Sequence, residues 1–277
     1  MKNKLTHHIK NKIGKWQVIY SEERKFIWFK NAKVAGTSMY RGLMQKEISD
    51  VVGYKDNPME FDKWWDSLTD EKIDDYFKFV FVRNPYDRVV SAFNHIIMEQ
   101  TLQSYVDVWP IIHPGDIYGR PTEMTFDMIF MLFSLFVKRG LQTYDINKDS
   151  VHWMPQNNHV EMDGYQIVDF VGKYENLKVD WRHVAKKIGV SEELPFVGAS
   201  TTAKDKNQTR EEQQKLHWSY FYIDAYIINA VSKFYRRDID IFEYNNLETQ
   251  LLERQLINIK SMELNPVHKL PNNMKNV

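Results

Sequence analysis

The sequence predicts an α/β fold, a three-layer sandwich in which helices cover both faces of a central parallel sheet. Two aromatic and aliphatic runs, 26–29 and 77–82, are apolar throughout, as expected of strands that are buried on both faces. A segment with helical periodicity follows each run, and strands that alternate with helices are typical of parallel sheets. The chain has 277 residues, of which 43% are hydrophobic, and this suffices for a sizeable core.

The predicted elements follow one another along the chain. The first half contains one or two strands at 17–30, a helix at 37–48, short helices within 54–76, a strand at 77–83 and a helix at 85–99. The second half contains an irregular segment at 100–123, a helix at 124–139 stopped by Gly140, a loop at 150–166, a strand at 167–171, a helix at 176–188 stopped by Gly189 and a long helix at about 209–236. The simplest interpretation is that residues 1–277 form one domain, with 246–277 as a peripheral extension.

Composition excludes several classes of function. Lys plus Arg and Asp plus Glu both number 37, so there is no overall basic field of the kind that binds nucleic acid. The chain has no cysteine, which excludes disulfides, thiolate metal sites and cysteine nucleophiles and fits a reducing compartment. Residues 1–16 lack a signal-peptide core, and the apolar run 128–137 has about half the length that a bilayer requires. We therefore expect a cytoplasmic protein without a transmembrane segment.

The segment Lys33-Val34-Ala35-Gly36-Thr37-Ser38 follows the first apolar run and opens a helical pattern. A strand that ends in a small, cationic turn before a helix is a common way to hold a phosphate-like anion, because backbone N–H groups converge there and the helix dipole favours negative charge. The segment fails the nucleotide-triphosphatase pattern, since its lysine precedes the glycine by three positions. Arg83 also stands where that pattern expects a Mg²⁺ ligand, so we expect a site that uses no metal.

The second cationic turn begins at Arg83 and leads into a helix. Asn84 is suited to the N-cap position and Pro85 to the first helical position. A rotation of 100° per residue gathers the apolar side chains on one face and Asn84, Arg88, Ser91 and His95 on the opposite face. Arg83 and Ser91 could therefore grip one anion, whereas the alternative is an ordinary amphipathic helix with a solvated polar face. Two such turns predict a ligand with two anionic ends.

At these residues the sequence resembles the sulfotransferases that use 3′-phosphoadenosine-5′-phosphosulfate (PAPS), and in particular the Golgi-type carbohydrate sulfotransferases and their bacterial relatives. The resemblance implies a P-loop-like nucleotide-binding core over about residues 25–244. It places Lys33, Val34, Ala35, Gly36, Thr37 and Ser38 at the 5′-phosphosulfate, and Arg83 and Ser91 at the 3′-phosphate. Three later segments also resemble the family in order, and they are His152-Trp153-Met154-Pro155-Gln156, the Asp169–Leu177 segment and the Phe234–Phe242 segment.

The resemblance implies transfer of a sulfuryl group to a hydroxyl acceptor. Lys33 is the expected catalytic cation, because a lysine near the leaving oxygen stabilises the charge that develops there. Histidine is the first choice for the base that takes the acceptor proton, and His152 ranks ahead of His95. A structural role for His152 is nearly as well supported. The other candidates for the base are His113, His159, Glu47, Glu60 and Asp62.

Two other functions remain open from the sequence. One is a nucleotide kinase-like phosphotransferase, which the missing Gly-Lys-Ser/Thr pattern and Mg²⁺ ligand disfavour. The other is a catalytically inactive nucleotide-binding or partner-binding protein on the same scaffold. For an active enzyme we expect PAPS as the donor, no metal, and a carbohydrate or glycolipid as the acceptor.

Overall fold

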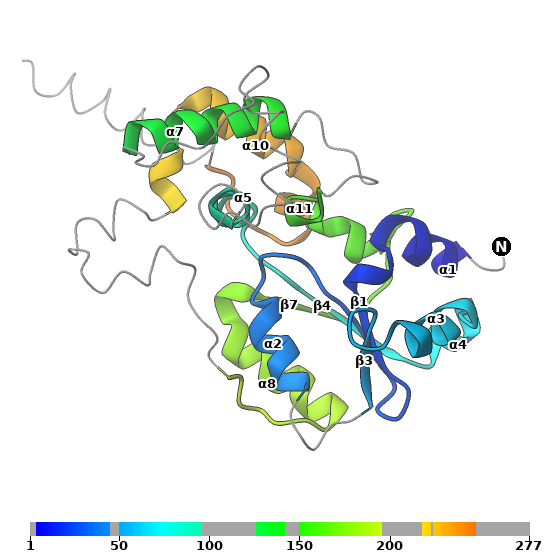
Figure 1. Ribbon diagram of the computed structural model, residues 1–277. Coiled ribbons are helices and arrows are strands. Elements are labelled where there is room, and N and C mark those ends of the chain that lie inside the picture. The colour runs from blue at the N-terminus through cyan, green and yellow to red at the C-terminus, as the bar shows by residue number, and fades with distance from the viewer. Residues whose placement is uncertain are drawn as a thin grey trace, which may run out of the picture.

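The computed structural model describes residues 4–44, 50–95, 126–141, 150–195, 218–222 and 224–247. A five-stranded sheet forms its centre (Figure 1). In spatial order the strands are β3 (Val51–Gly53), β1 (Val18–Ser21), β2 (Phe26–Phe29), β4 (Phe77–Val82) and β7 (Phe170–Lys173). A second, two-stranded sheet consists of β5 (Glu161–Met162) and β6 (Tyr165–Gln166). The α/β class predicted from the sequence is therefore confirmed.

The prediction of a wholly parallel sheet is wrong. β2, β4 and β7 are parallel, but β1 runs antiparallel to both β2 and β3. A hairpin joins β1 to β2 through a charged turn that ends at Lys25, whose φ is 50°. All residues of β1 and β2 are buried, so the antiparallel strand has the same apolar pattern as its parallel neighbours.

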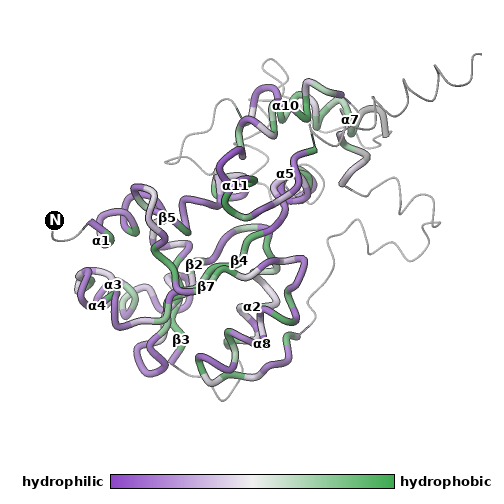
Figure 2. Tube along the Cα trace, turned by 180° about the vertical axis from the view of Figure 1, so that it is seen from behind, coloured by the Kyte–Doolittle hydropathy of each residue, from purple (hydrophilic) through white to green (hydrophobic). Residues whose placement is uncertain are grey.

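Helices cover both faces of the sheet. Phe26, Trp28, Phe79 and Phe81 pack with α2 (Gly36–Leu43) and α8 (Leu177–Ile188) on one face. The alternate residues of the same strands pack on the other face with η1 (Ile9–Ile13), α3 (Pro58–Asp66) and α4 (Asp70–Asp74). Figure 2 shows the hydrophobic stretches concentrated along the strands and along α7 (Phe126–Leu135). Burial on both faces confirms the three-layer arrangement.

A separate cluster of helices lies beyond the end of β4 (Figure 1). It joins α5 (Pro85–Phe93), α7, the turn η4 (Phe136–Gly140), η9 (Trp218–Phe221), α10 (Ala225–Phe234) and α11 (Arg236–Ile241) around one apolar core. The long helix predicted at about 209–236 is wrong where the structure describes it, because Asp224 caps a new helix that starts at Ala225. No helix among the described residues combines the length and the apolar character needed to span a membrane.

The third strand of the parallel part lies later in the chain than the sequence predicts. The predicted strand covers 167–171, whereas β7 covers Phe170–Lys173. Asp169 explains the delay, because its carboxylate accepts from the backbone N–H of Lys78 at 2.7 Å and its own N–H bonds to the Lys78 carbonyl. The remaining short elements are α1 (Lys4–His8), η2 (Lys15–Gln17), η5 (Ser150–His152), η6 (Gln156–His159) and η7 (Tyr174–Asn176).

Candidate functional site

The loop of residues 30–35, called here the lysine loop, joins β2 to α2 in a strained conformation. Lys33 has φ 65° and Ala35 has φ 53°, and both values lie in the left-handed region that costs about 1–2 kcal/mol for a residue other than glycine. Val34 between them is fully buried and anchors the loop in the core. Ala35 occupies the N-cap of α2 without a capping side chain, whereas Asn57 and Asn84 cap α3 and α5. The first turn of α2 is therefore suited to an external acceptor such as an anion.

Lys30 is a second cation in the lysine loop, which the sequence analysis did not single out. Its ammonium lies 5.5 Å from the ring centroid of Tyr40, and its stem runs along the start of α2 beside Gly36. Burial lowers the pKa of Lys30, the charge of Lys55 lowers it further, and Asp56 raises it. A bound anion would offset the free-energy cost of burying the Lys30 charge. Lys30 could have been found from the sequence, because Lys30 and Lys33 are three residues apart directly after a predicted strand.

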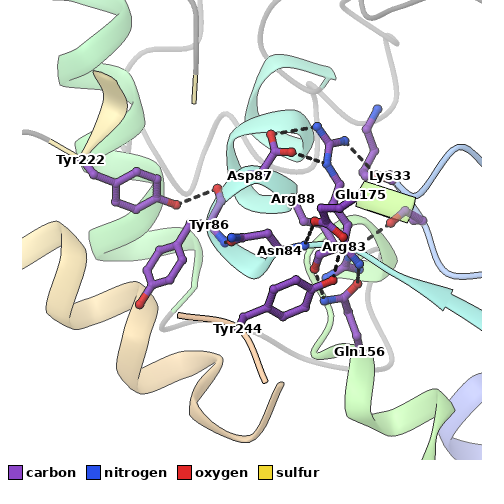
Figure 3. Close-up of polar contacts among 11 residues, drawn as sticks. Lys33, Arg83, Asn84, Tyr86, Asp87, Arg88, Gln156, Glu175, Tyr222 and Tyr244 are labelled. Atoms are coloured by element: carbon purple, nitrogen blue, oxygen red, sulfur yellow. Dashed lines mark hydrogen bonds and ion pairs between the residues drawn. The ribbon is translucent and has the colours of Figure 1, made fainter. Parts of the chain in front are cut away.

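Arg83 links the second cationic turn to the first. Its Nε and Nη2 form a bidentate pair with the Asp87 carboxylate at 2.7 and 2.8 Å, and its Nη1 donates to the backbone carbonyl of Lys33 at 3.0 Å (Figure 3). The ring of Tyr174 lies 4.4 Å from the centre of the guanidinium. These bonds use three of the five N–H groups, so Arg83 is largely committed within the protein, and its other two N–H groups make no hydrogen bond to the described residues.

The segment after β7 holds in place the turn of Arg83 and Asn84, called here the arginine turn. Glu175 accepts the backbone N–H of Asn84 at 2.7 Å with one carboxylate oxygen and the hydroxyl of Tyr244 at 3.0 Å with the other. Figure 3 shows Glu175 beside Asn84, and Tyr244 on the side of Asn84 away from Asp87. Since β4 and β7 are parallel neighbours, their carboxyl ends meet at one sheet edge and bring these side chains together.

Arg88 lies on the polar face of α5, and this face is not solvated at Arg88, which argues against the alternative of an ordinary amphipathic helix. Its side chain is fully buried, with 0% exposure. The guanidinium donates to Ala32 O at 3.0 Å and Asn31 Oδ1 at 3.1 Å in the lysine loop. It also donates to Met154 O at 2.7 Å and Val151 O at 3.4 Å, on either side of the candidate base. One buried cation therefore fastens together the two segments that carry the candidate catalytic residues.

A buried polar network continues from Arg88 toward α11. The side-chain oxygen of Gln156 accepts from Arg83 N and from Asn31 Nδ2, both at 2.9 Å, and its amide nitrogen donates to Arg83 O at 2.8 Å. The carboxylate of Asp238 on α11 accepts the backbone N–H groups of Gln156 and Asn157, both at 2.8 Å. Burial raises the pKa of Asp238 to about 6, although these N–H groups and Arg88 oppose that shift.

The structure brings together His152 and His95, the first two candidates for the base. Their ring centroids are 5.0 Å apart, and the Nδ1 of His152 is buried without a hydrogen-bond partner in the described structure. Burial lowers the pKa of His152 to about 3, and His95, Lys33, Arg88 and Lys55 lower it further in that order. His152 is therefore a neutral imidazole at pH 7, within electrostatic reach of Lys33.

The other predicted site residues have less direct support. Ser91 is half-buried on α5, Thr37 is exposed and Ser38 is half-buried on the first turn of α2. His159 is fully buried and bonds through Nε2 to Gln17 Oε1 at 3.0 Å, so it has a structural role. Glu60 bonds to Asn57 at the start of α3, and Asp62 pairs with Lys15 at 3.3 Å. Glu47 and His113 lie outside the described residues.

The described part of the chain contains no group of three His, Cys, Asp or Glu side chains that could hold a metal ion. Cations instead gather at the carboxyl ends of β2 and β4, where the lysine loop and the arginine turn lie in hydrogen-bond contact. Such an edge can bind a ligand with phosphate-like groups and can stabilise negative charge on a leaving oxygen.

Comparison with known proteins identifies similar chains. Carbohydrate sulfotransferase 14 of Danio rerio is 24% identical over 238 residues, which cover 82% of this chain and 62% of the relative. The Homo sapiens protein of the same name is also 24% identical, over 60% of its length. A protein of Archaeoglobus fulgidus described as uncharacterized is 32% identical over 133 residues, which are 48% of this chain and 83% of that protein. No solved structure matches the chain.

The alignments span about three-fifths of the length of the carbohydrate sulfotransferases that the chain matches. A family model described as "Sulfotransferase family" matches residues 16–245, which include β1, the lysine loop, the arginine turn and α11. This range also contains the core that the sequence motifs outline. The chain belongs to the sulfotransferase family.

Proposed function

We propose that the protein transfers a sulfuryl group from PAPS to a hydroxyl of a carbohydrate. Membership of the sulfotransferase family supports the transfer, and the names of the relatives support a carbohydrate acceptor. The observation that carries the donor proposal is the 3.0 Å hydrogen bond from Arg83 Nη1 to Lys33 O, because it holds two cationic turns side by side. A donor with one phosphosulfate and one phosphate has anionic groups for both turns.

The residues present fit such a donor. In the proposal Lys33 and Lys30, with the first turn of α2, bind the 5′-phosphosulfate, and Arg83 uses its two remaining N–H groups for the 3′-phosphate together with Ser91. Lys33 also stabilises the charge that develops on the oxygen bridging sulfur and phosphate.

The proposed reaction requires a base. The bond between sulfur and the phosphate oxygen breaks while the acceptor oxygen bonds to sulfur, and the acceptor hydroxyl gives up its proton. His152 receives this proton in the proposal, with His95 as its neighbour. A pKa near 3 makes His152 a weak base. An anionic donor beside Lys33 offsets one cause of the lowered pKa, so His152 becomes a stronger base when the donor is bound.

The test is transfer from ³⁵S-labelled PAPS to a panel of oligosaccharides, lipids and small alcohols. Lys33→Ala should reduce transfer about 100- to 1000-fold, the usual effect of losing a strong oxyanion donor. Arg83→Ala should mainly weaken binding of 3′-phosphoadenosine-5′-phosphate (PAP). Lys25→Ala is the matched control, because Lys25 also has positive φ but precedes β2 at the opposite end of the strand. A Lys33→Ala variant with wild-type transfer would overturn the mechanism.

A further inference from the structure

A surface group of side chains, called here the Trp16 patch, consists of the exposed Trp16 and Lys55 and the half-buried Tyr54. The Trp16 side chain is 58% exposed, although Trp is among the side chains whose burial removes the most apolar area from water. The Tyr54 ring meets it nearly at a right angle, with centroids 4.5 Å apart, and the Lys55 ammonium lies 5.6 Å from the Trp16 centroid. Trp and Tyr are enriched at binding surfaces, because each combines an apolar ring with a polar group.

The sheet topology places the Trp16 patch at the same edge as the lysine loop. Trp16 precedes β1, while Tyr54 and Lys55 follow β3. Because β1 is antiparallel to both β2 and β3, the start of β1 lies beside the carboxyl ends of β2 and β3. The hydrogen bond from Lys30 N–H to Gln17 O, at 2.7 Å, joins the lysine loop directly to the residue after Trp16.

Charge also connects the Trp16 patch to the candidate base. Lys33 in the lysine loop and Lys55 in the patch both lower the pKa of His152. His152 is therefore within electrostatic reach of the proposed donor cation and of the patch. Lys15 is another cation near the patch, with its ammonium 4.0 Å from the centroid of the Tyr54 ring. It already pairs with the Asp62 carboxylate, so Lys55 is the better candidate for binding an anionic group.

We infer that the Trp16 patch is the acceptor subsite and that it selects an acidic sugar. A sugar ring stacks its apolar face on the exposed indole of Trp16, and a negatively charged group of the sugar pairs with Lys55. This places the acceptor hydroxyl at the sheet edge that carries His152 and Lys33. The inference rests on the proposed function and goes beyond it by naming the residues and the charge of the acceptor.

The test measures saccharide binding with saturation-transfer NMR. The probes are a hexasaccharide of alternating glucuronate and N-acetylglucosamine and its neutral, carboxyl-reduced form. The wild type should bind the acidic probe about tenfold more tightly than the neutral one, the effect of one partly exposed ionic contact with good geometry. Trp16→Ala should weaken binding of both probes about tenfold. Lys55→Ala should remove the preference for the acidic probe.

Tyr165→Ala and Lys187→Ala are the matched controls. Tyr165 is 76% exposed on β6, and Lys187 lies over the ring of Phe77 at the opposite end of the sheet, so both should leave binding unchanged. Wild-type binding of neither saccharide, or unchanged binding by Trp16→Ala, would overturn the inference. The melting-temperature shift with PAP is recorded on the same variants. If PAP raises the melting temperature of variants that do not bind saccharide, the donor proposal holds independently of the acceptor subsite. If PAP does not raise the melting temperature of the wild type, the proposed function itself is refuted.

Discussion

Replacing Arg88 by methionine should destabilise the protein more than any surface substitution, because it removes the buried guanidinium between two segments of the site. Among the described residues, Arg88 donates to the carbonyls of Ala32, Val151 and Met154 and to the side chain of Asn31. A hydrogen bond from a charged donor contributes about 1.5–3 kcal/mol, and a buried acceptor left without a donor costs about 1–3 kcal/mol.

These contributions do not add fully, since Arg88→Met also removes the free-energy cost of burying a charge. Removing one partner from a buried charged network typically lowers the free energy of unfolding by about 3–5 kcal/mol. At about 2–4 °C for each kcal/mol in a chain of this size, the melting temperature should fall by about 10 °C. The pKa of Asp238 should rise further in Arg88→Met, because Arg88 favours the charged form of Asp238.

The assay is urea unfolding followed by tryptophan fluorescence, with thermal unfolding as a second measurement. Arg88→Lys keeps the charge but loses the planar fork, and it serves if Arg88→Met does not fold. Arg182→Met, on the exposed surface of α8, is the matched control and should change stability by less than about 0.5 kcal/mol. A stability of Arg88→Met within about 1 kcal/mol of wild type would refute the structural role given to Arg88.

Three further results are expected. Burial lowers the folded-state pKa of His152 and His159 to about 3, so the free energy of unfolding should decrease as pH falls from about 6.5 toward 3, by up to about 1.4 kcal/mol per pH unit for each histidine. Urea unfolding between pH 7 and 4 measures this decrease, and an equally steep decrease in His159→Gln would contradict the prediction. Asp238 acts in the opposite direction between pH 4 and 6, since its pKa is raised to about 6. Gly172→Ala should lower the melting temperature by several degrees, because a Cβ there would lie 2.4 Å from the Phe81 ring; an unchanged melting curve would contradict the close approach. PAP should raise the pKa of His152 in a histidine NMR titration, and an unchanged pKa would separate His152 from the donor site.

Much of the fold follows from the apolar runs. The run 77–82 and the pattern after Asn84 predict β4 and α5 closely, because the cap and the period-3.6 pattern agree. The antiparallel pairing of β1 could not be predicted from burial, since buried strands look alike in either direction. It depends on the short turn that ends at Lys25.

In the site, too, features that depend on local sequence patterns could be predicted, whereas contacts between distant segments could not. Lys33 and Arg83 could be found because each follows a strand, and parallel strands bring their carboxyl ends together. The burial of Arg88 could not be predicted, because a helical rotation shows which side chains share a face and not what packs on that face. Gln156 and Asp238 meet across 82 residues of sequence, and no local pattern predicts such a contact.

The central claim is that the lysine loop and the arginine turn bind the two anionic groups of the donor without a metal. The most direct measurement is the melting temperature with PAP in the presence of EDTA, compared with ATP and Mg²⁺ at equal concentration. At 100 times its Kd, PAP should stabilise the protein by about 2.7 kcal/mol, a rise of about 5–10 °C, and ATP with Mg²⁺ should have a much smaller effect. Equal shifts, or a larger shift with ATP and Mg²⁺, would contradict the claim.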